Sequence, residues 1–302
     1  MRKGLTLTLI ATIGLVLSAC SGDADTKIDD DSEGADRSFD VSQVEVVEEI
    51  AELVPDAIRD DGTLVIGASI DYAPAEFRAD DLQTAIGYDV DLSKALGKVL
   101  DLEVETSSAE FASILPGIGT KYDLGISSFT INDERTANYN MISYINVGSS
   151  FAVKAGNPDR FDPESLCGES IGVQNGTVQQ DDLEEKSAEC SDAGEEAIDV
   201  VVYGTQSDVT TNVVGGKIIA MFADSTVSGY SVAMTNDQLE VVGDVIDSAP
   251  QGIVVAQDDE ELTEAVLQAT QHLMDEGVWD DILASWGAED AALDEATVFP
   301  EK

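Results

Sequence analysis

Apolar residues recur with two different periods along the chain from about Gly62 onward. The run TLVIGAS, residues 63–69, is short, apolar and rich in β-branched residues, which is typical of a buried strand. In residues 89–102, Leu92, Leu96 and Val99 recur at the spacing of one helical face. Strands that alternate with helices predict an α/β fold with a largely parallel sheet.

The same alternation continues along the chain and restarts once. Residues 102–108 and 122–129 are predicted strands, and residues 111–119 are a predicted short helix. The run SIGVQNGTVQQDDLEE, which begins at Ser170, again indicates a strand, a glycine turn and a helix. Further strands are predicted at residues 197–204, 217–224 and 252–257, and one long helix at residues 259–287. The pattern therefore predicts two similar α/β units.

The first twenty residues, MRKGLTLTLIATIGLVLSAC, form a separate pattern. A basic head at residues 2–3 precedes an apolar run, residues 5–17, that is too short for a good membrane span. This pattern predicts an export signal in residues 1–19. The final LSAC resembles the lipobox of bacterial lipoproteins, in which the signal is cut before the cysteine and lipid is attached to its sulfur. We therefore expect a mature chain that begins at a lipidated Cys20. The alternative is a plain secretory signal that contains a cysteine.

Residues 20–61 are predicted to form an acidic tether followed by a short helix. Residues 21–40 have no apolar periodicity and are rich in Asp, Ser and Gly, which is typical of a solvated, self-repelling segment. The Asp cluster also suggests calcium, but the spaced ligands and turn glycine of an EF-hand are missing, which favours the tether. The run SQVE at residues 42–45 resembles a capping box that opens a short helix, which Pro55 disturbs.

The charge of the chain narrows its possible partners. With 61 acidic and 15 basic residues, the formal net charge is −46 at pH 7. Nucleic acids and anionic lipids would be repelled, so no nucleic-acid partner is expected. Solubility in a salty medium explains the excess of acid, because salt screens it. A hydrophobic content of 43% is enough for a buried core in one large or two medium domains.

The sequence carries no signature of an enzyme. The motifs G-x-S-x-G, the P-loop and a full G-x-G-x-x-G are absent. His272, the sole histidine, lies in the last predicted helix with no cysteine or nucleophile nearby, as expected of a solvent-facing or packing histidine. We therefore expect no catalytic residue, no metal and no cofactor.

The chain has three cysteines, an odd number for an exported protein. If Cys20 carries lipid, Cys167 and Cys190 remain as a pair. A bridge between them would close a modest loop, persist in an oxidising compartment and contribute about 3 kcal/mol. The alternative is two buried free thiols.

Fragments spread along the chain resemble, in the same order, the amino-acid-binding proteins of ATP-binding-cassette importers, solute-binding protein family 3. They are GTLVIGASIDYAPAEF, IGYDVDLSKALGK, KYDLGISSFTINDER, LCGESIGVQNGTVQQ, GGKIIAMFADSTVSGY and DEGVWDDILASWG. The resemblance runs from about Gly62 to Gly287. It implies a two-lobed periplasmic-binding-protein type II fold, in which two crossing strands join the lobes around a ligand cleft. Lobe 1 is expected at residues 62–147 and 251–302, and lobe 2 at residues 148–250.

The same resemblance assigns ligand-binding roles. Arg135 matches the family arginine that binds the α-carboxylate of the ligand, and a guanidinium pairs with a carboxylate bidentately. Asp224 matches the acid that holds the α-ammonium. The other expected contacts are hydroxyl or backbone groups, a turn at a helix N-terminus, and aromatic walls of the cleft. These are Ser127, Ser128 and Thr130, then Gly176 and Thr177, and finally Tyr72 and Phe129.

Each of these residues also has an ordinary structural explanation. Arg135 is otherwise a surface arginine that pairs with one of the two acids directly before it. Asp224 and Gly176 are otherwise turn residues. The two aromatic residues are otherwise part of the core.

The sequence departs from the family pattern at three positions. Ala75 stands where an aromatic residue is often found, and Val178 stands where a second threonine is common. Ser69 stands where some members that bind cationic side chains place an acid, although Asp71 and Glu76 lie close by in the sequence. The identity of the ligand therefore stays open at this level.

Residues and resemblance together predict a lipoprotein on the outer face of the cell membrane. It would capture a free, polar amino acid and deliver it to an ABC permease, while a separate ATPase subunit hydrolyses ATP. We expect a monomer without catalytic activity. Two alternatives remain. One is a dehydratase-like enzyme on the same scaffold that acts on a small carboxylate, with Asp71 or Glu76 as acid or base. The other is a sensory ligand-binding subunit.

Lipidation at Cys20 can be tested directly. Intact-mass measurement of membrane-extracted protein is expected to show a lipid adduct on a chain that starts at Cys20. A mature form with a different, unmodified N-terminus would contradict the prediction.

Overall fold

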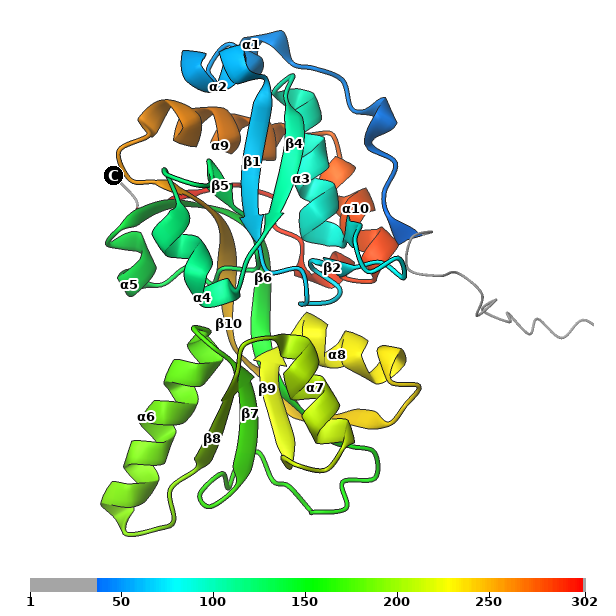
Figure 1. Ribbon diagram of the computed structural model, residues 1–302, viewed down its shortest axis with the longest axis vertical. Coiled ribbons are helices and arrows are strands. Elements are labelled where there is room, and N and C mark those ends of the chain that lie inside the picture. Colours follow the sequence, from blue (N-terminus) through cyan, green and yellow to red (C-terminus); the bar gives the residue numbers. More distant parts are fainter. Residues whose placement is uncertain (1–36, 301–302) are drawn as a thin grey trace, which may run out of the picture. The chain divides into compact units, whose positions relative to one another are not determined.

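Two long strands, β6 (Tyr139–Lys154) and β10 (Leu239–Ala256), pair antiparallel from the Leu239–Lys154 pair to the Ala256–Tyr139 pair. They form the middle of a computed structural model that describes residues 37–300, all of which belong to one compact unit (Figure 1). The predicted signal in residues 1–19 and the predicted lipidation site Cys20 lie outside the described residues.

Each end of the β6–β10 pair carries a set of parallel strands, and the strand order of the whole sheet is β4-β1-β5-β10-β6-β9-β7-β8. In the first set β10 pairs with β5 (Leu124–Gly125), followed by β1 (Thr63–Ala68) and β4 (Glu103–Ser108). In the second set β6 pairs with β9 (Ala220–Asp224). Next to β9 lies β7 (Ser170–Gln174), and next to β7 lies β8 (Asp199–Tyr203). The predicted α/β fold is thus confirmed, with an antiparallel pair joining two parallel halves.

Helices pack on both halves, which we call the first and second lobes. The first lobe carries α1 (Glu48–Ala51), α2 (Asp56–Asp61), α3 (Tyr88–Val99), α4 (Phe111–Ile114), α5 (Asp133–Thr136), α9 (Glu260–Asp275) and α10 (Val278–Trp286) (Figure 1). The second lobe carries α6 (Val178–Ala193), α7 (Gln206–Val214) and α8 (Ser225–Met234). The predicted apolar face of α3, with Leu92, Leu96 and Val99, is fully buried. None of the helices among residues 37–300 is long and apolar enough to cross a membrane.

Short elements complete the described chain. They are the 3₁₀ turns η2 (Val41–Gln43), η3 (Leu115–Gly117) and η4 (Glu289–Ala291), the two-residue strands β2 (Phe77–Arg78) and β3 (Ala85–Ile86), and β11 (Val298–Phe299), which pairs with β6. A disulfide joins Cys167, just before β7, to Cys190 in α6. The predicted lobe boundaries after residues 147 and 250 fall inside β6 and β10, and they stay predictions.

Four expected elements differ from the structure. The single helix at residues 259–287 is two helices, because Gly277 adopts a left-handed φ of +72° between α9 and α10. The expected capping box at residues 42–45 is wrong: the side chain of Asp40 accepts the N–H of Ser42 in η2, and α1 begins later. Only two residues of the expected strand 122–129 are strand, and β10 begins thirteen residues before the predicted strand at residues 252–257.

A buried carboxylate ties the N-terminal segment to the first lobe. The side chain of Asp91 in α3 has no exposed surface. Its Oδ2 accepts hydrogen bonds from the backbone N–H of Phe39 and from the indole N–H of Trp286, both at 2.9 Å. Its Oδ1 lies 3.3 Å from Nζ of Lys94. One side chain therefore joins the segment before α1 to α3 and α10.

Replacing this carboxylate should destabilise the fold. In Asp91→Ala the buried indole N–H of Trp286 and the partly buried backbone N–H of Phe39 lose their acceptor, which should lower the free energy of unfolding by about 3 kcal/mol. Asp280→Ala, which removes an exposed acid from the first turn of α10, should change it by less than about 0.5 kcal/mol. Urea unfolding of the two variants measures both values. Equal stabilities would show that Asp91 has no special structural role.

Candidate ligand-binding site

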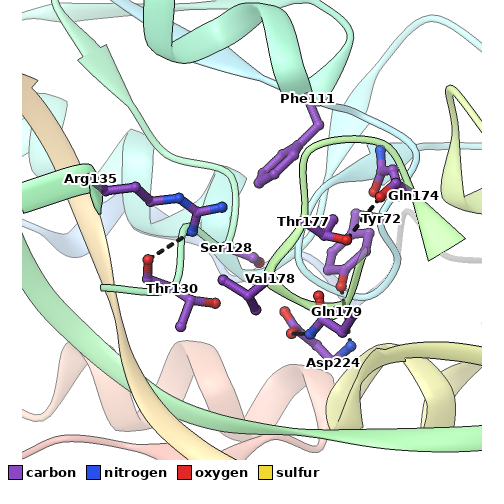
Figure 2. Close-up of a pocket in the computed structure, with 10 residues that line it drawn as sticks. All are labelled: Tyr72, Phe111, Ser128, Thr130, Arg135, Gln174, Thr177, Val178, Gln179 and Asp224. Atoms are coloured by element: carbon purple, nitrogen blue, oxygen red, sulfur yellow. Dashed lines mark hydrogen bonds between the residues drawn. The ribbon is translucent and has the colours of Figure 1, made fainter. Parts of the chain in front are cut away.

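A small pocket lies between the two lobes, and residues of both lobes line it (Figure 2). Its free volume is about 10 Å³, which is room for about one water molecule. The lining residues are Tyr72, Phe111, Ser128, Thr130 and Arg135 from the first lobe, and Gln174, Thr177, Val178, Gln179 and Asp224 from the second. Six of the nine residues predicted to bind ligand are thus brought together here: Tyr72, Ser128, Thr130, Arg135, Thr177 and Asp224.

Arg135 is positioned by α5, whose N-cap residue Asn132 accepts the backbone N–H of Arg135. Its side chain is only 8% exposed. The guanidinium donates to the carbonyl of Thr130 at 2.7 Å and, across the cleft, to the carbonyl of Gly176 at 3.3 Å. Among residues 37–300 it forms no ion pair with a carboxylate, so the surface pair with Asp133 or Glu134 considered from the sequence is not formed. Burial lowers the pKa of Arg135, and the negative charge of Asp224 opposes this effect.

Aromatic rings flank the same guanidinium. Its central carbon lies 5.5 Å from the ring centre of Phe129 and 5.8 Å from that of Phe111, within the range of cation–π attraction. These two rings stack on each other with centroids 4.7 Å apart. Phe111 lines the pocket, while Phe129 is completely buried and supports Phe111 and Arg135. The structure therefore places Phe129 behind the wall of the cleft.

Asp224 ends β9 on the opposite side of the pocket from Arg135 (Figure 2). Its Oδ1 accepts from Gln179 at 2.8 Å, and its Oδ2 accepts from Gln251 at 2.7 Å. Its backbone N–H donates to the hydroxyl of Tyr72 at 3.2 Å. Burial raises the pKa of Asp224 to about 6, although both glutamines favour the charged form. The carboxylate is thus fixed in place by neutral donors.

Ser128 forms the floor of the pocket, and Ser127 lies beneath it. Ser128 lines the pocket with a left-handed φ of +53°, an unusual conformation for a residue other than glycine. The hydroxyl of Ser127 points into the first lobe instead, where it donates to Glu76 and accepts the N–H of Ser69. Ser127 therefore supports the site from below and does not line it.

The turn at Gly176–Thr177 closes the pocket from the second lobe. Gly176 has a φ of +79°, and a Cβ there would lie 2.9 Å from Cβ of Ala112, so only glycine fits. Its N–H donates to Gln180, and its carbonyl faces Arg135. Thr177 caps α6 by accepting the N–H of Gln180. The first turn of α6 therefore begins at the rim of the pocket.

Four lining residues were not among those predicted to bind ligand: Phe111, Gln174, Val178 and Gln179. Gln174, which is 1% exposed, donates to Ser69 Oγ and Asp71 Oδ1, each at 3.3 Å. Its side-chain amide oxygen, Oε1, is buried without a donor. No motif marks a glutamine at a strand end as a ligand contact, so the sequence offered no signal for it.

The two acids considered for a catalytic role lie in different places. Asp71 lines a wider groove of about 750 Å³ next to the pocket, where it accepts the backbone N–H of Gln206 at 3.2 Å. Burial raises the pKa of Asp71 to about 6. Glu76 is 1% exposed and lines neither space. Among residues 37–300, no group of three His, Cys, Asp or Glu side chains is placed to hold a metal ion.

The pocket therefore presents one cation and one anion, on opposite walls and from different lobes. A zwitterion fits such a pair, because its carboxylate can face the guanidinium while its ammonium faces the carboxylate. Both protein charges are held rigidly by hydrogen bonds before any ligand binds.

Known proteins resemble the chain over most of its length. The model of the bacterial extracellular solute-binding proteins, family 3, matches residues 64–289. The arginine-binding protein ArgT of Corynebacterium glutamicum is 35% identical, over 95% of this chain and 94% of that protein. Among solved structures, an ancestral arginine-binding protein bound to arginine is 28% identical with a TM-score of 0.68, over 74% of this chain and 98% of that one.

A second solved structure with a similar fold is described as the precursor of an enzyme. The ancestral amino acid-binding protein AncCDT-1, a precursor of cyclohexadienyl dehydratase, is 26% identical with a TM-score of 0.68, over 76% of this chain and 98% of that one. The match of the family model across most of the chain, together with the 35% identity to ArgT, is decisive. The chain belongs to the bacterial extracellular solute-binding proteins, family 3.

Proposed function

We propose that this protein binds a free amino acid between its lobes and delivers it to an ABC permease from a lipid anchor at Cys20. One observation carries the binding proposal: Arg135 and Asp224 face the same pocket from different lobes. Arg135 would bind the α-carboxylate, and Asp224 the α-ammonium. Ser128, Thr130 and the first turn of α6 would complete the carboxylate site, and Tyr72 and Phe111 would enclose the rest of the ligand.

The far end of the ligand would meet hydrogen-bond acceptors. Gln174 offers an unpartnered side-chain oxygen, Oε1, and the carboxylate of Asp71 accepts a hydrogen bond from the same amide. No basic residue other than Arg135 lines the pocket. A side chain that donates hydrogen bonds and carries positive charge suits this end, so arginine is the proposed ligand. The names of the relatives support this choice, since ArgT and the ancestral structure are both described as arginine-binding.

Binding would exchange contacts between the lobes for contacts with the ligand. The lobes are joined across the pocket by bonds from Arg135 to Gly176, from Asp224 to Tyr72 and from Gln174 to Asp71. The free space is too small for an amino acid, so the lobes must separate for a ligand to enter. Contacts to both lobes would then favour closure around it.

We also propose that the protein carries out no chemistry on its ligand. A dehydratase would need an acid or base that faces the ligand carbons. Glu76 is enclosed beneath the floor of the pocket, and Asp71 is held by two donors from the second lobe. The relatives support this view because they are named as binding proteins, although one solved neighbour is a precursor of an enzyme.

Removing Arg135 should abolish tight binding. In Arg135→Ala a desolvated carboxylate of the ligand loses its partner, at a cost of about 3–5 kcal/mol, or at least a hundredfold in Kd. Asp224→Ala should behave similarly. The control is Arg160→Ala, which removes an exposed arginine of the second lobe and should leave Kd unchanged. Titration calorimetry with arginine measures all three variants.

Two outcomes of that titration would reject the proposal. Arginine affinity in Arg135→Ala equal to that of the wild type would exclude this site, and an absence of binding in the wild type would exclude arginine. Incubation of the wild-type protein with arginine, followed by NMR of the small molecules, should show no product. A new product would establish the enzymatic alternative.

Arginine affinity should weaken in mild acid. The pKa values of Asp71 and Asp224 are both raised to about 6, so both side chains lose their charge as the pH falls through that value. Kd should therefore rise between about pH 7 and pH 5.

Citrulline, the neutral analogue of arginine, should bind more weakly at pH 7.5. In Asp71→Asn the preference for arginine over citrulline should shrink. An unchanged preference would show that Asp71 does not interact with the guanidinium of the bound arginine.

A further inference from the structure

Two carboxyl groups lie directly beneath the floor of the pocket. Glu76, from the loop between β1 and β2, and Asp89, from the first turn of α3, are each 1% exposed. The three ion pairs among residues 37–300 are Arg59–Asp56, Lys94–Asp91 and Lys186–Asp182, and none includes either residue. Two adjacent buried carboxylates without a cation cannot both remain charged at low cost.

One oxygen of each carboxyl group accepts hydrogen bonds, and the other oxygen has no donor. Glu76 Oε1 accepts the hydroxyl of Ser127 at 2.5 Å, and Asp89 Oδ2 accepts the N–H of Ser128 at 2.9 Å and the hydroxyl of Tyr144 at 3.0 Å. The other two oxygens, Glu76 Oε2 and Asp89 Oδ1, are buried and have no donor. Glu76 and Asp89 lie within reach of each other, so a proton held between the two groups would supply a donor where none is present.

The partners of each group indicate which one holds the proton. Asp89 accepts two strong donors on one oxygen, which favours its charged form. Glu76 accepts only one. We propose that Glu76 is a neutral carboxylic acid that donates its proton to Asp89, and that this pair positions Ser127 and Ser128 for the ligand. Burial and the charge of Asp89 raise the pKa of Glu76 well above its usual range, in agreement with this geometry.

The other groups that face the pair also favour a shared proton. Asp71 and Tyr72 come from the loop after β1, Tyr88 comes from α3, and Tyr144 comes from β6. Burial raises the pKa of each tyrosine well above its usual value, which keeps the rings neutral. Within the described part of the chain, the groups that act on the pair are thus negative or neutral.

The pair acts on the ligand only through the floor of the pocket. Glu76 holds Ser127, and Asp89 holds Ser128 in its left-handed conformation, which a serine adopts only under constraint. Both are therefore positioning residues. This role rests on the proposed function, because it concerns the binding of an amino acid at Ser128, whereas the shared proton itself does not.

The proton can be detected without any ligand. Infrared spectra of the purified protein at pH 7.5 should contain the C=O band of a protonated carboxylic acid. The band should be missing in Glu76→Gln and present in Glu110→Gln, which changes an exposed glutamate of the first lobe. Absence of the band in the wild type, or its persistence in Glu76→Gln, would overturn the proposal.

The positioning role is tested by rescue with the isosteric amide. In Glu76→Gln the amide can accept from Ser127 and donate to Asp89, so Kd for arginine should stay within about threefold of the wild type. Glu76→Leu can do neither, and its Kd should rise about tenfold or more. A folded Glu76→Gln variant that loses tenfold or more would overturn the positioning role. If the wild type shows the infrared band but binds no arginine, the proposed ligand fails and the shared proton stands.

Discussion

The antiparallel pairing of β6 with β10 is the constraint to which both lobes are attached. The parallel strands of the first lobe join the sheet through β10, and those of the second lobe join it through β6. The pairing is irregular between Val242 and Ile246, between Ile246 and Ala249, and between Gln251 and Gly252. Such irregularities bend strands and change their twist locally. The last of them lies at the glutamine that holds Asp224, so the bend of the sheet and the geometry of the site are coupled.

The residues that face the pocket are fixed by residues that do not. Asp224 is held by two glutamine amides, Arg135 by a carbonyl and two aromatic rings, and Ser128 by Asp89. Fixed charges bind a ligand better than mobile ones, because less freedom is lost on binding. The same support explains how a strongly acidic chain keeps one cation available in its cleft: Arg135 is surrounded by carbonyl oxygens and rings, and no carboxylate neutralises it directly.

Much of the fold could be predicted from sequence, because apolar periodicity reports burial, and Leu92, Leu96 and Val99 are buried as expected. The length of β10 could not, since its first twelve residues contain glycine, aspartate and proline and only Leu239 among them is buried, so they lack the apolar signal of a strand. Arg135 and Asp224 could be singled out by family resemblance. Gln174, Gln179 and Asp89 could not, because their importance comes from contacts between segments far apart in sequence, which no local pattern records.

Contacts between the lobes compete with the ligand for the groups that face the pocket. The carbonyl of Gly176 occupies one donor of Arg135, and the hydroxyl of Tyr72 bridges the lobes to the backbone of Asp224. Observed affinity is then the intrinsic affinity of the open form multiplied by the fraction of molecules that are open. Variation at residues that never touch the ligand can therefore tune affinity, by weakening or strengthening the closure of the empty molecule.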